Sequence, residues 1–243
     1  MTGRISQIID SSVVDGPGNR TAIFFQGCNF NCHYCHNPET IAKGSSKQDI
    51  ELEEVLQRIR KNRPFIKGIT VSGGECTLQH EFLSALFKET KKMGLTNFID
   101  TNGSLLLKDL PELLEVTDGV MLDVKATDVT SHIDLTGQDN KNVLENARFL
   151  ASIGKLYELR TVVVEGDLFN EKTVEGVGDL LAPYIGTSSS GTEERTIRYK
   201  IIPFRPYGVR EAYRYHKAPD AETMDKLKAL ALAKGFTEVI VPK

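Results

Sequence analysis

The sequence predicts an α/β fold, a single domain over residues 1–243 that forms a partial, open, TIM-like (β/α)6 barrel. Short apolar segments rich in β-branched and aromatic residues alternate with amphipathic segments along the whole chain. This alternation indicates parallel strands joined by crossover helices. Polar residues also follow one predicted strand after another, and they can converge on one rim only if the sheet curls around it.

The elements are expected in a regular order. The predicted strands span residues 21–27, 68–74, 97–103, 118–125, 156–166, 195–204 and 237–241. The predicted helices span residues 49–60, 82–93, 109–116, 142–153, 171–185 and 221–234. In the first helix, Leu52, Val55, Leu56 and Ile59 recur three and four residues apart, as one buried helical face requires. Glycines follow several of the helices and predict their ends.

Composition excludes several classes of function. The net charge is −3 and no basic stripe is visible, so we expect no nucleic-acid partner. No apolar run reaches the ~18 residues of a membrane span, and the N-terminus lacks a signal peptide's apolar core. We therefore expect a cytoplasmic protein without membrane contact, whose four cysteines are ligands or thiols rather than disulfides. We also expect it to be a monomer. The Gly/Ser/Thr-rich segment 186–194 is expected to be a mobile surface loop.

The segment GCNFNCHYCHNP follows the first strand and contains Cys28, Cys32 and Cys35 in a C-x3-C-x2-C spacing. Three thiolates within eight residues can surround one metal centre. A structural zinc site needs four ligands, so zinc with His33 or His36 as the fourth is an alternative. A [4Fe–4S] cluster on three cysteines would leave one iron open to a ligand from outside the protein. Cys76 is interpreted as a small packing residue.

This spacing, with the aromatic Tyr34 before the third cysteine, resembles the signature of the radical SAM superfamily. The resemblance implies one [4Fe–4S] cluster whose open iron is chelated by S-adenosylmethionine (SAM). One electron would then cleave the C5′–S bond, giving methionine and a 5′-deoxyadenosyl radical that abstracts hydrogen. It also implies a barrel of the radical SAM type.

The same resemblance implies the residues that bind SAM. Ser72-Gly73-Gly74-Glu75 is similar to the family's GGE motif, although a tight turn after the strand is the alternative. The implied SAM contacts are Tyr34, Cys35, His36, Gly73, Gly74, Glu75, Asp123, Val124, Lys125 and Arg205. For Lys125 the alternative is a solvated surface lysine. Arg205 replaces a histidine of the family's PYH segment, and its guanidinium could still bind a carboxylate or a ribose oxygen.

Four residues at two adjacent strand ends match a monovalent-cation site of some relatives. They are Asp100, Thr101, Met121 and Asp123. Carboxylate and carbonyl oxygens at such positions suit a small cation, here Na⁺ or K⁺. The alternative is that Asp100 caps the DTNG turn.

The segment DGPG-x-R before the cysteines, followed by YCHNP, SGGE, DTNG and MLDVK, resembles the glycyl-radical-enzyme activating enzymes. The resemblance covers residues 4–241. Pyruvate formate-lyase activase is the best-known type in this family, and details such as FIKGITVSGGE look closer to the YjjW-type activases. Many of these carry an eight-cysteine ferredoxin-like insert after CHNP, which this sequence lacks. Auxiliary clusters are therefore not expected.

The implied reaction removes a Cα hydrogen from one glycine of a partner glycyl radical enzyme. Asp15, Gly16, Pro17 and Gly18 would hold the partner's loop, with an ordinary turn as the alternative. Flavodoxin or ferredoxin would donate the electron. The segment 210–217 is either a docking surface or a solvated tail. Two other functions remain open: a radical SAM enzyme for a small molecule, and a non-enzymatic zinc or iron–sulfur module.

Overall fold

The computed structural model describes residues 1–42, 49–166, 169–186 and 196–242. The chain divides into two compact units. The first unit consists of Met1–Asn29, Asn37–Thr101 and Leu105–Met121, and the second of Phe30–His36, Asn102–Ser104 and Leu122–Lys243. The chain passes between the units several times, the last time within the strand β6 (Gly119–Asp123).

The first unit is built on a sheet with the strand order β3-β1-β2-β4-β5. Its strands are β1 (Thr2–Ser12), β2 (Arg20–Phe25), β3 (Asp49–Glu51), β4 (Gly68–Gly73) and β5 (Thr96–Thr101). β2, β4 and β5 are parallel, whereas β1 is antiparallel to both β2 and β3. β1 was not predicted from the sequence, because serine, glutamine and aspartate interrupt its apolar residues and weaken the alternation. β3 was not predicted either: its three residues were assigned to the start of the helix expected over 49–60, and that helix begins at Leu52.

Three helices bury apolar faces in this unit. They are α1 (Leu52–Asn62), α2 (His80–Lys92) and α3 (Pro111–Glu115). α1 buries Val55, Leu56 and Ile59 of the predicted face, whereas Leu52 at its start is half-buried. Short 3-10 helices span Pro38–Thr40, Arg63–Phe65, Cys76–Gln79, Leu107–Asp109 and, in the second unit, Glu211–Tyr213.

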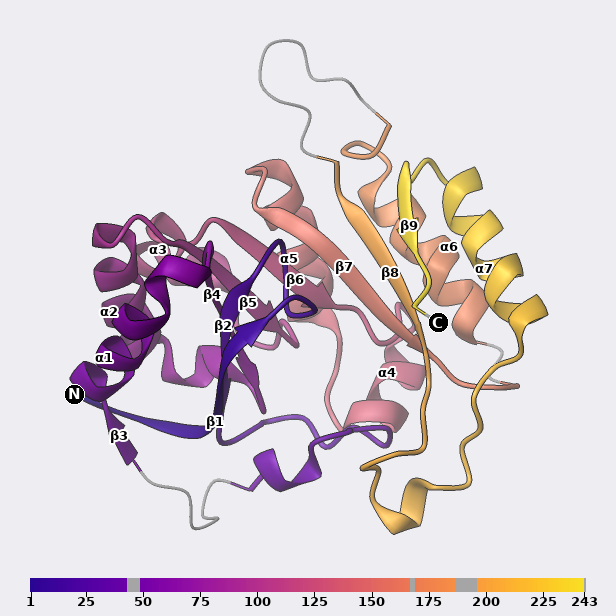
Figure 1. The fold of residues 1–243 in the computed structure, drawn as a ribbon. Helices are drawn as coiled ribbons and strands as arrows, with labels where there is room; N and C mark the ends of the chain where they lie inside the picture. Colours follow the sequence, from indigo (N-terminus) through magenta and orange to yellow (C-terminus); the bar gives the residue numbers. More distant parts are fainter. Residues whose placement is uncertain (43–48, 167–168, 187–195, 243) are drawn as a thin grey trace. The chain divides into compact units, whose positions relative to one another are not determined.

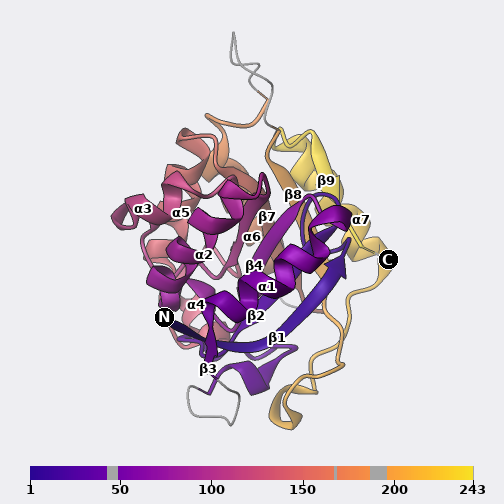
Figure 2. The same cartoon turned by 60° about the vertical axis from the view of Figure 1, so that its left-hand side comes forward.

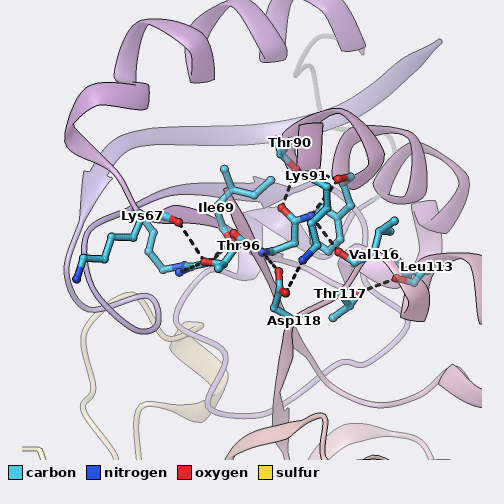
Figure 3. Close-up of polar contacts among 12 residues, drawn as sticks. Lys67, Ile69, Thr90, Lys91, Thr96, Leu113, Val116, Thr117 and Asp118 are labelled. Atoms are coloured by element: carbon cyan, nitrogen blue, oxygen red, sulfur yellow. Dashed lines mark hydrogen bonds and ion pairs between the residues drawn. The ribbon is translucent and has the colours of Figure 1, made fainter. Parts of the chain in front are cut away.

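Side chains fix the beginning of β5 (Figure 3). The carboxylate of Asp118 accepts a 2.7 Å hydrogen bond from the backbone N–H of Asn97 and forms an ion pair with Lys91. The hydroxyl of Thr96 donates to the backbone oxygen of Lys67 at 3.1 Å. These contacts stabilise the end of the sheet from which the parallel strands begin.

The second unit contains the parallel strands β7 (Leu156–Val163), β8 (Arg198–Pro203) and β9 (Glu238–Ile240). Its helices are α4 (Val129–Thr136), α5 (Lys141–Ser152), α6 (Phe169–Leu181) and α7 (Ala221–Ala233). α6 and α7 pack against each other and against these strands (Figures 1 and 2). α4, which has only eight residues, was not predicted from the sequence.

The predicted strands and helices otherwise occur within a few residues of their expected bounds. Residues 187–194 of the predicted mobile loop lie outside the described residues. Among the described residues, no helix is long and apolar enough to cross a membrane.

Candidate active site

Three neighbouring parallel strands of the first unit end at the same edge of the sheet. Phe25 at the end of β2 pairs with Gly73 at the end of β4. Beyond the strands, Gly74 donates its N–H to Phe25 at 2.9 Å, and Glu75 donates to Gly27 at 2.8 Å. The chain that leaves β4 is therefore bonded to the chain that leads into Cys28, as the predicted convergence of strand ends requires.

The glycine pair is required by close backbone contacts. A Cβ on Gly73 would lie 2.1 Å from the backbone nitrogen of Phe25, and the φ angle of Gly73 is +120°. A Cβ on Gly74 would lie 2.4 Å from the backbone oxygen of Gly27. Both glycines thus allow the chain before Cys28 to pack on the end of β4, which is a structural reason for the motif beside its implied contact with SAM.

Glu75 is buried and oriented by hydrogen bonds. Its Oε1 accepts from the N–H of Thr77 at 3.0 Å, the hydroxyl of Thr77 at 2.6 Å and the hydroxyl of Thr101 at 2.7 Å. Glu75 therefore caps a 3-10 helix and links β4 to β5. Cys76 beside it is fully buried, its thiol donates to the backbone oxygen of Asp100 at 3.5 Å, and burial raises its pKa well above the usual value. These contacts agree with a packing role for Cys76.

The residues of the predicted cation site have protein partners. The hydroxyl of Ser72 donates to Asp100 at 3.0 Å, and the hydroxyl of Thr101 donates to Glu75. Met121 is buried in β6. Asp100, Thr101 and Met121 belong to the first unit, whereas Asp123 belongs to the second.

The cysteine loop, residues 28–36, enters the second unit at Phe30. A 3.3 Å hydrogen bond from the N–H of Cys35 to the backbone oxygen of Cys32 closes the C-x2-C turn. Lys125 donates to the Oδ2 atom of Asp123 at 2.9 Å, and its ammonium lies 5.5 Å from the centre of the Tyr34 ring. The second unit thus brings Tyr34, Asp123 and Lys125 together, and Lys125 is buried rather than solvated.

The electrostatics of this group favour a charged lysine. Burial alone would lower the pKa of Lys125, but Asp123 and Cys32 outweigh it and hold that pKa well above its usual value. Burial raises the pKa of the Cys32 thiol, and the nearby Lys125 ammonium opposes this shift. A metal ligand must be a thiolate, so Lys125 lies where a cation stabilises the ligating form of Cys32.

Helix α4 supports the cysteine loop and was not predicted from the sequence. The backbone oxygens of Thr136 and Leu135 accept from the N–H groups of Asn31 at 2.8 Å and His33 at 2.9 Å. The last carbonyl oxygens of a helix lack hydrogen-bond donors within the helix, and here the loop supplies two N–H donors to them. Gly137 ends α4 at a φ of +78°, and this glycine was the signal from which the helix end could have been predicted.

His36, Val124 and Arg205 occupy different surroundings. The Nε2 atom of His36 lies 2.9 Å from the backbone oxygen of Arg205, whose side chain is exposed. The backbone of Val124 is engaged by β7, because its N–H donates to Arg160 and its oxygen accepts from Thr161. The side chain of Val124 is fully buried.

The Asp15–Gly18 turn lies at the other end of the parallel strands in the first unit. Asp15 accepts from the hydroxyl of Ser12 at 2.5 Å. The buried guanidinium of Arg20 donates to the backbone oxygens of Pro17 at 3.1 Å and Ile69 at 2.7 Å. Five residues of β2 separate this edge from Phe25, about 17 Å at ~3.3 Å per residue. The turn and the glycine pair thus mark opposite edges of the same strands.

The cysteines are thiols, and none forms a disulfide with another. Within the described part of the chain, no three His, Cys, Asp or Glu side chains form a group that could hold a single metal ion. Cys28 belongs to the first unit and Cys32 and Cys35 to the second.

Comparisons with known proteins identify the family. The model of the radical SAM superfamily matches residues 22–181. The pyruvate formate-lyase 1-activating enzyme of Escherichia coli strain K12 is 34% identical over 242 residues, which cover 94% of this chain and 94% of that protein. The pyruvate formate-lyase-activating enzyme of Clostridium pasteurianum is 30% identical and covers 98% of both chains.

The fold agrees with these relationships. The structure of Streptococcus suis SuiB bound to S-adenosylmethionine matches with a TM-score of 0.66 at 14% identity, over 90% of this chain and 48% of that one. The predicted fold class, a partial barrel of the radical SAM type, is confirmed. The chain therefore belongs to the radical SAM superfamily and, within it, to the family that contains the pyruvate formate-lyase activating enzymes.

Proposed function

We propose that this chain activates a glycyl radical enzyme by removing a hydrogen atom from the Cα of one glycine of that enzyme. The observation that carries the proposal is the 34% identity to a pyruvate formate-lyase activating enzyme over 94% of both chains. The relationship extends over nearly the full length of both chains. The proposal is also supported by the DGPG-x-R turn, which precedes the cysteines as in the activating enzymes.

The family implies a [4Fe–4S] cluster and SAM, and the residues present fit both. Cys28, Cys32 and Cys35 are the proposed cluster ligands, since three soft thiolates suit iron and leave one iron open. The buried ammonium of Lys125 beside Cys32 supports the thiolate form. When bound and given one electron, the pair supplies methionine and a 5′-deoxyadenosyl radical, which takes the glycine hydrogen and leaves 5′-deoxyadenosine and a glycyl radical.

The residues proposed to bind SAM come from both units. Lys125 is held by Asp123 and would attract the SAM carboxylate or a ribose oxygen. The Gly73-Gly74-Glu75 segment offers backbone groups at the strand end next to the cysteine loop. Tyr34, Cys35, His36, Val124 and Arg205 complete the proposed set. Binding of Na⁺ or K⁺ by Asp100, Thr101, Met121 and Asp123 is a further part of the proposal.

The proposal extends to the partners. A reduced flavodoxin or ferredoxin would supply the electron, and the chain would act as a cytoplasmic monomer. The partner's glycine loop would contact the Asp15–Gly18 turn. Because this turn lies at the edge opposite the glycine pair, the loop would have to extend along the strands to reach the cluster.

The test is anaerobic reconstitution with iron and sulfide, followed by incubation with SAM, a reductant and candidate glycyl radical enzymes. We expect about four irons per chain, 5′-deoxyadenosine and methionine as products, and a glycyl doublet in the EPR spectrum of the partner. Turnover of a free metabolite without a doublet on any partner would favour a small-molecule enzyme. One bound zinc without SAM cleavage would contradict radical chemistry altogether.

A further inference from the structure

A segment far along the chain covers the cysteine loop within the second unit. The guanidinium of Arg210 donates from Nη2 to the backbone oxygens of Cys32 at 2.7 Å and Asn31 at 3.0 Å. Its Nη1 donates to the side-chain oxygen of Asn31. One side chain thus binds three acceptors on two consecutive residues, of which the second is a proposed cluster ligand.

We propose that Arg210 is a positioning residue for the iron–sulfur cluster. Its guanidinium fixes the backbone at Cys32 and thereby the direction in which the Cys32 thiolate points. The inference rests on the proposed function in one respect, because it takes the cysteine loop to be the cluster site. Arg210 contacts neither cluster nor SAM in this role and acts through the loop.

Two neighbours of Arg210 in the sequence also contact the cysteine loop. The ring of Tyr213 stacks on His33 with 4.1 Å between centres and 15° between planes, and Arg210 lies 4.7 Å above the Tyr213 ring. A Cβ on Gly208 would lie 2.4 Å from the backbone oxygen of His36, and the φ angle of Gly208 is +78°. Gly208, Arg210 and Tyr213, which we name the C-terminal clamp, therefore contact the loop at both ends of its C-x2-C turn.

The loop is held from two directions. The last turn of α4 accepts hydrogen bonds from Asn31 and His33, while Arg210 binds the carbonyl oxygens of Asn31 and Cys32. The N–H groups and the carbonyl oxygens of this stretch thus both have partners outside the loop. A loop ordered before its metal arrives loses less conformational entropy on binding, and its ligands keep one geometry.

Only an arginine meets this geometry. A guanidinium presents donors on separate nitrogens in one rigid plane, whereas a lysine ammonium carries its three donors on a single nitrogen and lacks that planar fork. The charge has a second consequence. A cation bound to the backbone of a ligand stabilises the more negative, reduced state of a cluster, so Arg210 also raises the reduction potential.

The experiment compares the wild-type chain with Arg210→Ala and Arg210→Lys. Arg214→Ala is the matched control. Arg214 is an exposed arginine of the same segment, and its Nε donates to the backbone oxygen of Val209 within that segment. Hydrogen exchange of the apo protein is measured for amides 31–36. Reconstituted protein is assayed for iron, for the EPR signal of the reduced cluster with and without SAM, and for its reduction potential.

We expect Arg210→Ala to raise exchange of the loop amides about tenfold or more, because hydrogen bonds to a charged donor are lost. It should also broaden the EPR signal and shift the potential to more negative values. Arg210→Lys should restore the potential but not the slow exchange. Arg214→Ala should match the wild type in every readout.

If Arg210→Ala shows the same amide exchange, EPR signal and reduction potential as the wild type, the inference is overturned. Exchange of β7 and β8 amides reports whether the variant is folded, and Asn31→Ala, which removes a single acceptor, gives a milder second test. Failure of the proposed function would be distinct, since the wild-type chain itself would then lack the cluster or fail to cleave SAM.

Discussion

Lys125 and Asp123 form a partly buried ion pair of 2.9 Å at the end of β6, and the two side chains are 10% and 30% exposed. The pair is placed against Tyr34 of the cysteine loop. Because the carboxylate already neutralises the ammonium, a SAM carboxylate at this position would share Lys125 with Asp123. The pair therefore links stability to the proposed binding of SAM.

Lys125→Ala should lower the free energy of unfolding of the apo protein by ~2–3 kcal/mol. This is less than the ~3–5 kcal/mol of a fully buried pair, because Asp123 keeps some contact with water. Anaerobic urea denaturation measures the loss. Lys88→Ala, which removes the exposed pair with Glu112, is the control and should change little. Equal stability of Lys125→Ala and the wild type would show that the pair does not stabilise the fold.

Gly74→Ala should displace the chain before Cys28, because its Cβ would lie 2.4 Å from the oxygen of Gly27 and 2.7 Å from that of Thr40. Backbone atoms cannot move aside as a flexible side chain can, so we expect a loss of ~2 kcal/mol or more together with reduced iron uptake. Gly94→Ala is the matched control. It has a φ of +76° but nothing within 4 Å, so it should cost only ~1 kcal/mol and leave iron uptake intact. The prediction fails if both variants take up iron equally well.

Single replacement of Cys28, Cys32 or Cys35 by alanine should abolish stable cluster binding, whereas Cys76→Ala should retain it. Cys76 is fully buried between Val71 and Asp100, so its loss affects packing and not ligation. Iron content and the absorbance of the reconstituted proteins distinguish the two outcomes. Loss of iron in Cys76→Ala at unchanged thermal stability would make Cys76 a ligand.

His132 should make stability depend on pH. The ring is buried in α4, Nδ1 lies 2.8 Å from the backbone oxygen of Gln138, and burial is the main cause that lowers its pKa. Because the pKa of the His132 imidazole is lower in the folded chain, the imidazole binds a proton more readily in the unfolded chain. Its contribution to stability is therefore present above the unfolded pKa of about 6.5 and is lost as the pH falls below that value.

Melting temperatures between pH 7.5 and 5.5 test this, and the wild type should lose stability towards acid. His132→Phe should be less stable at neutral pH, because the bond to Gln138 is lost, but should show a flatter profile. An unchanged slope in the variant would assign the pH dependence to other groups. NMR titration of the His132 ring would then give its pKa directly.

Much of the candidate site could be predicted from local patterns. The spacing of Cys28, Cys32 and Cys35, and the polar residues after successive strands, are properties of short segments. Parallel strands bring their carboxyl ends to one edge, so Gly73 and Glu75 were expected near the chain that follows β2, and the bonds of Gly74 and Glu75 confirm it. The edge at which the Asp15–Gly18 turn lies did not follow from its motif.

The sequence by itself determined the alternation of strands and helices, the family and the thiolates available to a cluster. Only the tertiary structure decided what supports those thiolates. Arg210 reaches Cys32 across 178 positions in the chain, and α4 supplies two carbonyl oxygens to the same loop. Periodicity and spacing report contacts between near neighbours, because they reflect local backbone geometry. Which distant side chain meets a given carbonyl depends on the path of the whole chain, and that path is settled only when the core packs.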